Sequence, residues 1–286
     1  MEKTERNPFL DIIKAVCILF VIITHDKISN ATRLKLLFPF WINMAVPMFM
    51  IISGYVYAAS FERNKIASLG QAYSVDFLMP KFIRYTVPFT MAFLIEIIGQ
   101  VLRKWGTSPE KLLWLFFEGG AGPGSYYYPL LLQFLFVYPL IYFVIRRLAF
   151  KGLLQCLAAN AAFEFFQHAW HCNATFYRLL IFRYTFVIAF GSWLYQKHDD
   201  EDRHIWKTVG MLLGVAFIVK YSFLSSKPYI ITYWTATSFI ACLYFVPLAE
   251  ILINHVRFSF KALELLGKRS EERRVGKEGR SRWSPY

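Results

Sequence analysis

Eight mostly apolar stretches of about 20 residues follow one another along the 286-residue chain. A helix needs about 20 such residues to cross about 30 Å of hydrocarbon. Inside a bilayer, helices and closed barrels are the only structures that pair all their backbone polar groups. The pattern therefore predicts an all-α fold, a polytopic membrane helix bundle. The predicted spans are residues 8–25, 36–59, 82–101, 126–145, 152–170, 177–196, 205–224 and 229–253.

Composition supports this class of protein and excludes others. Apolar residues make up 56% of the chain and charged residues 18%, against about 25% charged residues in an ordinary soluble domain. The net charge is +13, but the basic residues form short clusters between apolar stretches. Nucleic-acid binding needs a contiguous basic face, so no nucleic-acid partner is expected. We also predict no metal site, because His168, His171 and Cys172 lack a fourth ligand.

The distribution of Lys and Arg between the spans predicts the orientation. Cytoplasmic loops of membrane proteins carry an excess of these residues. With a cytoplasmic N-terminus, the inner segments hold fifteen Lys and Arg and the outer segments nine. The N-terminus is therefore expected in the cytoplasm. A cleaved signal peptide is disfavoured, because Asp11 and Lys14 interrupt the first apolar run and no small-x-small site follows it.

The last eighteen residues, 269–286, read RSEERRVGKEGRSRWSPY and differ abruptly from the apolar sequence before them. They resemble the conceptual translation of a common short-read sequencing adapter, with Gly279 where that translation has Cys. The alternative is a genuine basic tail near anionic lipid. Because of the resemblance to an adapter, we expect one membrane domain, residues 1–268, truncated at its C-terminus and followed by a non-native tail.

The first span carries three ionisable groups: Asp11, Lys14 and His25. At 100° per residue they share one helix face, with Lys14 and His25 about 16 Å apart along the axis. Intramembrane ionisable groups usually face a cavity, so this face is the first candidate site. The structural alternative is that Asp11 and Lys14 form an i,i+3 pair at the interface while His25 ends the helix.

Two further motifs follow. The second span contains VPMFMIISGY, in which Ser53 and Gly54 allow close approach of a ligand or of another helix. A basic loop then ends in Lys81 and Arg84, which lie on neighbouring positions of a helix. Such a pair can hold phosphate groups or simply anchor the helix at the cytoplasmic side.

Together these motifs resemble the acyltransferase-3 family of integral-membrane O-acyltransferases. The resemblance rests on D-x-x-K-x10-H over Asp11, Lys14 and His25, on VPMFMIISGY, and on KxxR at Lys81 and Arg84. YYYPLLLQFLFVYPLI, residues 126–141, and LELLGKRS, residues 263–270, are also similar to family segments. The family pattern has ten membrane helices and normally Arg at the positions of Lys14 and Lys81. Lys keeps the charge but not the planar fork of Arg.

The resemblance implies transfer of an acyl group, usually acetyl from acetyl-CoA, to a hydroxyl of a cell-surface or secreted glycan or its lipid-linked precursor. It implies an integral protein of the bacterial cytoplasmic (inner) membrane. His25 is the expected general base, since imidazole changes charge nearest to neutral pH, with Asp11 holding Lys14. The expected residues for acetyl-CoA are Lys81, Arg84, Ser53 and Gly54, joined by Lys14 and by Arg63 or Lys65. The alternatives are a transporter or flippase for a glycan or lipid intermediate, and a non-catalytic membrane partner.

Overall fold

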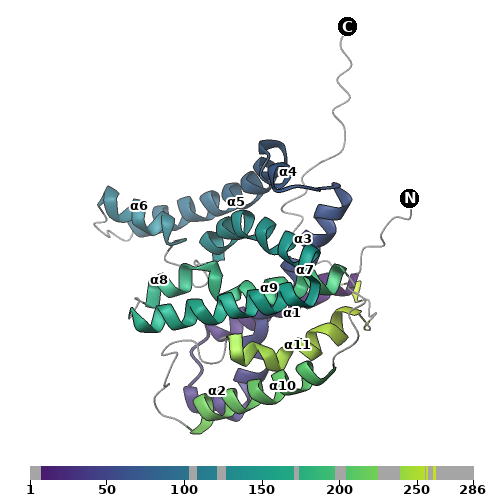
Figure 1. Cartoon of the computed structure of the whole chain (residues 1–286). Helices are drawn as coiled ribbons and strands as arrows, with labels where there is room; N and C mark the ends of the chain where they lie inside the picture. The colour runs from purple at the N-terminus through teal and green to yellow at the C-terminus, as the bar shows by residue number, and fades with distance from the viewer. Residues whose placement is uncertain are drawn as a thin grey trace.

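The regular structure of the described residues is helical. The computed structural model describes residues 8–102, 108–120, 127–170, 174–196, 204–224, 239–254, 256 and 260–261 (Figure 1). These ranges contain no strand, which confirms the predicted all-α fold. The predicted tail, residues 269–286, lies outside them.

The helices, in chain order, are α1 (Pro8–Thr24), α2 (Asn30–Lys35), the 3-10 helices η1 (Phe38–Phe40) and η2 (Ile42–Met44), α3 (Ala45–Arg63), α4 (Leu69–Ala72), α5 (Val75–Leu102), α6 (Pro109–Phe117), α7 (Tyr127–Ala169), α8 (Ala174–Leu179), the 3-10 helix η3 (Ile181–Tyr184), α9 (Thr185–Gln196), α10 (His204–Ile218), the π-helix η4 (Val219–Leu224) and α11 (Phe239–Asn254).

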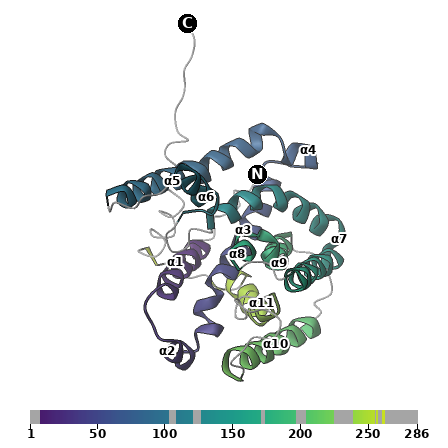
Figure 2. The same cartoon turned by 90° about the vertical axis from the view of Figure 1, so that its left-hand side faces the viewer.

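The long helices pack side by side into a bundle (Figure 1). The short helices α2, α6 and α8 lie towards one end of it, on the left in Figure 1 and facing the viewer in Figure 2. We call this the α2 end. The helix α1 begins at the opposite end and runs towards the α2 end. Up-and-down packing of this kind is what connected membrane spans require.

Among the described residues, three helical stretches are long and apolar enough to cross a membrane by length and composition: Phe38–Arg63, Tyr127–Ala169 and Trp206–Leu224. A fourth, Ile240–Asn254, is apolar but shorter. The protein is therefore a helical membrane protein, and the number of eight spans stays a prediction.

The long helix α7 contains two of the predicted spans. Its backbone breaks at Ala149, where φ is 49° and ψ is −122°, so residues 127–148 and 150–169 are two separate helical segments. A Cβ atom on Gly152 would lie 2.8 Å from the carbonyl oxygen of Val144. The turn is therefore so tight that only glycine fits there, and the two segments run back along each other (Figure 1).

Two other predicted spans contain 3-10 turns as well as α-helix. Residues 36–59 begin in the turns of η1 and η2, and the α-helix starts only at Ala45. Residues 177–196 are divided between α8, η3 and α9. Hydropathy detects both stretches, but it does not show these breaks, because a 3-10 turn and an α-helix bury apolar side chains equally well.

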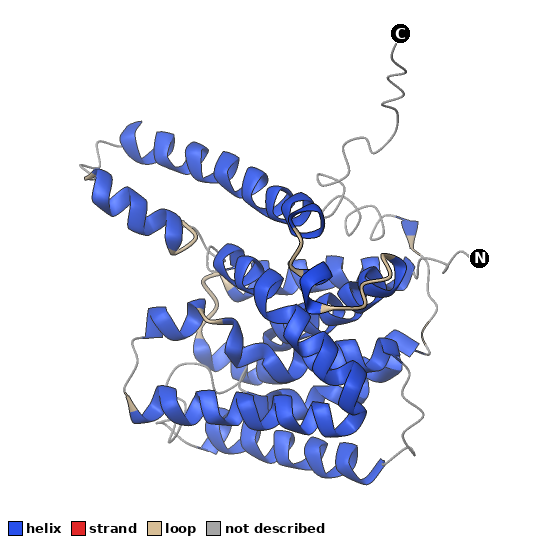
Figure 3. Ribbon diagram, turned by 45° about the horizontal axis from the view of Figure 1, so that its top comes forward, coloured by secondary structure: helices blue, strands red, loops and turns tan. Residues whose placement is uncertain are grey.

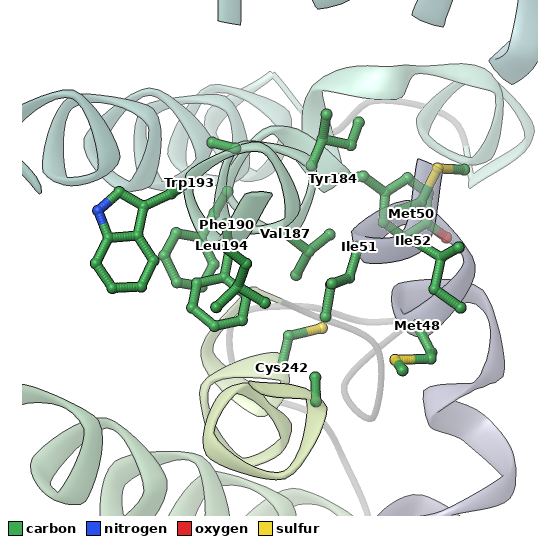
Figure 4. Close-up of a cluster of buried hydrophobic side chains, with 14 of the residues drawn as sticks. Met48, Met50, Ile51, Ile52, Tyr184, Val187, Phe190, Trp193, Leu194 and Cys242 are labelled. Carbon is green, nitrogen blue, oxygen red and sulfur yellow. The ribbon is translucent and has the colours of Figure 1, made fainter. Parts of the chain in front are cut away.

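The centre of the bundle is the crossing of α3 and α9. A Cβ atom on Gly54 would lie 2.1 Å from the carbonyl oxygen of Ile188, and one on Gly191 would lie 1.9 Å from that of Ile51. The two backbones therefore touch, as small residues permit in membrane helix pairs. Figure 4 shows the apolar side chains around this contact, with Ile51 from α3 and Cys242 from α11 near the residues of α9.

The pair α5 and α6 lies at the edge of the bundle (Figure 3), where the Tyr128 ring of α7 stacks on the Phe89 ring of α5 at 3.7 Å. The ring of Phe116 on α6 lies 5.1 Å from that of Phe89 and 5.2 Å from that of Phe93 on α5. The outer surface of α5 is apolar, with Met91, Leu94, Ile95 and Ile98 among its exposed residues. A large exposed apolar surface suits contact with lipid.

Candidate active site

The charged pair on α1 is buried inside the protein. Asp11 is 3% exposed and Lys14 is 9% exposed. Lys14 Nζ lies 4.0 Å from Asp11 Oδ1, so the two side chains form the predicted i,i+3 ion pair. Opposite charges close together reduce the cost of holding each of them in a low-dielectric interior. The structural alternative placed this pair at an exposed interface. In the structure the pair is buried in the bundle.

His25 does not lie on the α1 helix. The helix ends at Thr24, and the backbone N–H of His25 donates to the carbonyl oxygen of Ile22 across 3.0 Å in the turn that follows. Thr24 Oγ1 donates to the carbonyl oxygen of Val21 in the last turn of the helix. His25 directly follows the last helical residue, Thr24, so the prediction that its side chain shares one face with Asp11 and Lys14 stays a prediction. The imidazole is exposed, in the turn that leads to α2.

The two cations of KxxR lie one turn apart on α5, and a third cation joins them. The charge of Arg63, the last residue of α3, acts on Lys81 together with that of Arg84. Lys81 precedes the predicted span 82–101. Its Nζ donates to the carbonyl oxygen of Phe77 across 3.0 Å and lies 3.2 Å from the centre of the Phe77 ring.

Lys81 is partly buried, whereas Arg84 and Arg63 are exposed. Burial, followed by the charges of Arg84 and Arg63, lowers the pKa of Lys81 to about 8. The pKa is lowered because the charged ammonium form loses solvation and is repelled by the two neighbouring cations. An anion bound between these groups relieves both effects, so the cluster of Lys81, Arg84 and Arg63 is a candidate phosphate site. We call it the cation cluster.

Gly54 has a structural role in the described fold. It faces α9 at the helix crossing, and its carbonyl oxygen accepts a hydrogen bond from Tyr138 Oη across 2.9 Å. This contact explains why a glycine stands there without any ligand. Ser53 is partly buried beside it. The predicted role of both residues in binding acetyl-CoA stays a prediction.

Glu164 and Arg183, which fall in the predicted spans 152–170 and 177–196, are brought together around Tyr177. Both are 3% exposed. Tyr177 Oη donates to Glu164 Oε1 across 2.7 Å, and the Arg183 guanidinium lies 4.8 Å from the Tyr177 ring. These side chains come from α7, α8 and η3. Only the tertiary structure shows that they lie together.

Metal-binding groups of three or more His, Cys, Asp or Glu residues are absent from the described part of the chain. His168 is exposed at the end of α7. His171 and Cys172 lie in residues 171–173, outside the described residues.

Comparison with known proteins agrees with these motifs. The model of the acyltransferase-3 family, described as "Acyltransferase domain", matches residues 7–270. No curated protein and no solved structure gave a match. The matched range includes the ion pair on α1, the turn with His25 and the cation cluster. The chain is thus a membrane protein of the acyltransferase-3 family, and the acyltransferase activity of that family is the activity that its residues must support.

Proposed function

We propose that the protein transfers an acyl group, normally acetyl, from acyl-CoA to a hydroxyl of a cell-surface or secreted glycan or of its lipid-linked precursor. The observation that carries this proposal is the cation cluster. Lys81, in the second turn of α5, lies within electrostatic range of Arg84 on the same helix and of Arg63 at the end of α3. Clustered like charges beside a membrane span are unfavourable unless an anion binds them, and CoA is a polyanion made in the cytoplasm.

The members of the cation cluster differ in what they offer a phosphate. Arg84 and Arg63 present planar guanidinium forks that can hold two phosphate oxygens at once. Lys81 supplies a compact ammonium group. In the free protein this group donates to the Phe77 carbonyl, and its flexible side chain can turn towards an anion. With these cations on the cytoplasmic side, the N-terminus of the chain is also cytoplasmic, in a bacterial inner membrane.

His25 is the proposed general base. It accepts the proton of the acceptor hydroxyl while that oxygen attacks the thioester carbonyl carbon, which the pantetheine arm of CoA carries along α1 from the cation cluster to the α2 end. A covalent relay of the acyl group is the alternative. The new C–O bond forms, the C–S bond breaks, and the proton passes to the departing thiolate, which leaves as free CoA. A positioned base of this kind contributes about 10²- to 10⁴-fold in rate. The exposure of the imidazole in the turn after α1 supports this role, because a buried ring has no access to an incoming sugar.

Asp11 and Lys14 are assigned a supporting role on the first helix. Their ion pair keeps two charges stable within the bundle. The same buried pair also favours a second candidate function, a transporter or flippase for a glycan or lipid intermediate, because intramembrane charges often line a conduit. That function moves its substrate without cleaving a thioester.

The test uses membranes that contain the protein, acetyl-CoA labelled in the acetyl group, and the glycan fraction of the same cells. We expect label to enter the glycan and free CoA to appear in equal amount. His25→Ala should abolish both while the protein remains in the membrane. His168→Ala is the matched control, because His168 is a second exposed histidine, in the last turn of α7. Transport of glycan without release of CoA supports the second candidate instead.

A further inference from the structure

The turn that carries His25 is bound by the side chain of Arg33 of α2, in addition to the local hydrogen bond from the Lys27 N–H to Asp26 Oδ1. Arg33 Nη2 donates to the carbonyl oxygen of Thr24 across 3.0 Å and to that of Asp26 across 2.9 Å. Arg33 Nε donates to the carbonyl oxygen of Ile28 across 3.1 Å. One guanidinium therefore binds three backbone carbonyls of the connection between α1 and α2.

These contacts lie on both sides of His25. The Thr24 carbonyl belongs to the peptide group that enters His25, and the Asp26 carbonyl belongs to the second peptide group after it. Holding both fixes the backbone direction of His25, and that direction sets where the exposed imidazole stands. Hydrogen bonds from a charged donor are stronger than neutral ones, so three of them from one group make a firm restraint.

The rest of the connection is braced in the same region. Ser29 caps α2 by accepting from the backbone N–H of Thr32. Trp41 Nε1 donates to the carbonyl oxygen of Leu36 across 2.7 Å, and the Trp41 ring meets the Phe20 ring of α1 edge to face at 5.3 Å. The helix that carries Arg33 is thereby tied back to α1, so the guanidinium has a fixed base.

We infer that Arg33 is a positioning residue for the acyl transfer, which holds the His25 imidazole in place through the backbone on both sides of it. The inference rests on the proposed role of His25. This role also explains the location of Arg33, which the predicted topology places on the outer side of the membrane, where Lys and Arg are disfavoured. Lysine cannot replace it fully, because an ammonium lacks the planar fork that reaches three carbonyls from two nitrogens.

The test measures kcat and KM of acetyl transfer for Arg33→Ala, Arg33→Lys and Lys35→Ala in membranes with equal amounts of protein. Displacing a catalytic group by about 1 Å lowers the rate about 100-fold. We expect Arg33→Ala to lower kcat by about 10- to 100-fold, with the KM for acetyl-CoA unchanged, and Arg33→Lys to recover part of the loss. Lys35→Ala removes a neighbouring exposed cation of α2 and should leave both constants unchanged.

A wild-type kcat in Arg33→Ala would overturn the inference, and so would a loss that appears in KM for acetyl-CoA instead of kcat. If Arg33→Ala does not accumulate in the membrane, Arg33→Lys takes its place, and an undiminished kcat in that variant would count against the inference. His25→Ala distinguishes a failure of the proposed role of His25 from a failure of the role of Arg33. An active His25→Ala overturns the proposed base and with it the role of Arg33. An inactive His25→Ala beside a normal Arg33→Ala overturns the role of Arg33 alone.

Discussion

Gly54 of α3 and Gly191 of α9 lie at one helix crossing, where each faces the main chain of the other helix. The nearest approaches of an added Cβ would be 2.1 Å for Gly54 and 1.9 Å for Gly191, both to carbonyl oxygens. Backbone atoms cannot turn aside as a flexible side chain can. The distance between these two helices is therefore set by the absence of a methyl group at two positions.

The first prediction concerns this crossing. Gly54→Ala and Gly191→Ala should each destabilise the protein by about 1 to 3 kcal/mol or more, because overpacking forces backbone shifts. Gly70→Ala is the matched control, since a Cβ there would meet only Ser68 Oγ, at 3.9 Å. Thermal unfolding in detergent, followed by the loss of monodisperse protein, measures the difference. Equal stability of Gly54→Ala and Gly70→Ala would contradict the described packing.

The second prediction concerns the cation cluster. Lys81→Ala and Arg84→Ala should raise the KM for acetyl-CoA about tenfold, as expected for loss of one charged phosphate contact, with little change in kcat. Because Coulomb interactions at an exposed site are screened by salt, the KM of the wild type should also rise with ionic strength. Lys111→Ala on α6 serves as a control, since it removes an exposed cation near the α2 end. An effect on kcat alone would argue against phosphate binding.

The third prediction concerns pH. The pKa of Lys81 is lowered to about 8 by burial and by Arg84 and Arg63. The cation that binds phosphate is the protonated form, so it predominates below about pH 7, is half lost near pH 8 and disappears as the pH rises further. The KM for acetyl-CoA should accordingly be flat below about pH 7 and rise between pH 7 and 9.

Arg63→Gln provides the comparison for that pH profile. Removing the Arg63 charge takes away one cause of the lowered pKa, so the rise in KM should move to higher pH. Lys81→Arg should abolish the rise, because a guanidinium stays charged throughout this range. A pH dependence that survives in Lys81→Arg would assign it to another group.

The fourth prediction concerns the ion pair between α10 and α11. Lys207 Nζ lies 2.9 Å from Glu250 Oε1 and 2.9 Å from Oε2, with Lys207 8% exposed. Removing one partner leaves a charge in a poorly solvated place, so Glu250→Gln should destabilise the protein by about 3 kcal/mol. The double variant Lys207→Leu with Glu250→Leu should recover much of that loss. If the losses of stability of the single variants Lys207→Leu and Glu250→Leu add in the double variant, the groups do not interact.

Local features of this chain were predictable because they depend on residues close in sequence. Hydropathy identifies stretches of helix length, and a spacing of three places Lys14 beside Asp11 and Arg84 beside Lys81 whatever the rest of the chain does. The spacing rule does not settle the place of His25, because His25 comes directly after the last residue of α1, Thr24, and the turn after a helix does not follow helical spacing.

Contacts between distant residues required the tertiary structure. A glycine in an apolar stretch can face lipid, a ligand or another helix, and only the position of Gly191 shows that Gly54 meets a helix. Arg63 joins Lys81, and Arg33 reaches the carbonyl beside His25, because turns bring their helices together. Helices form from local hydrogen bonds that a sequence pattern reveals, whereas their crossings follow from the shape of every surface that packs, which no single stretch contains.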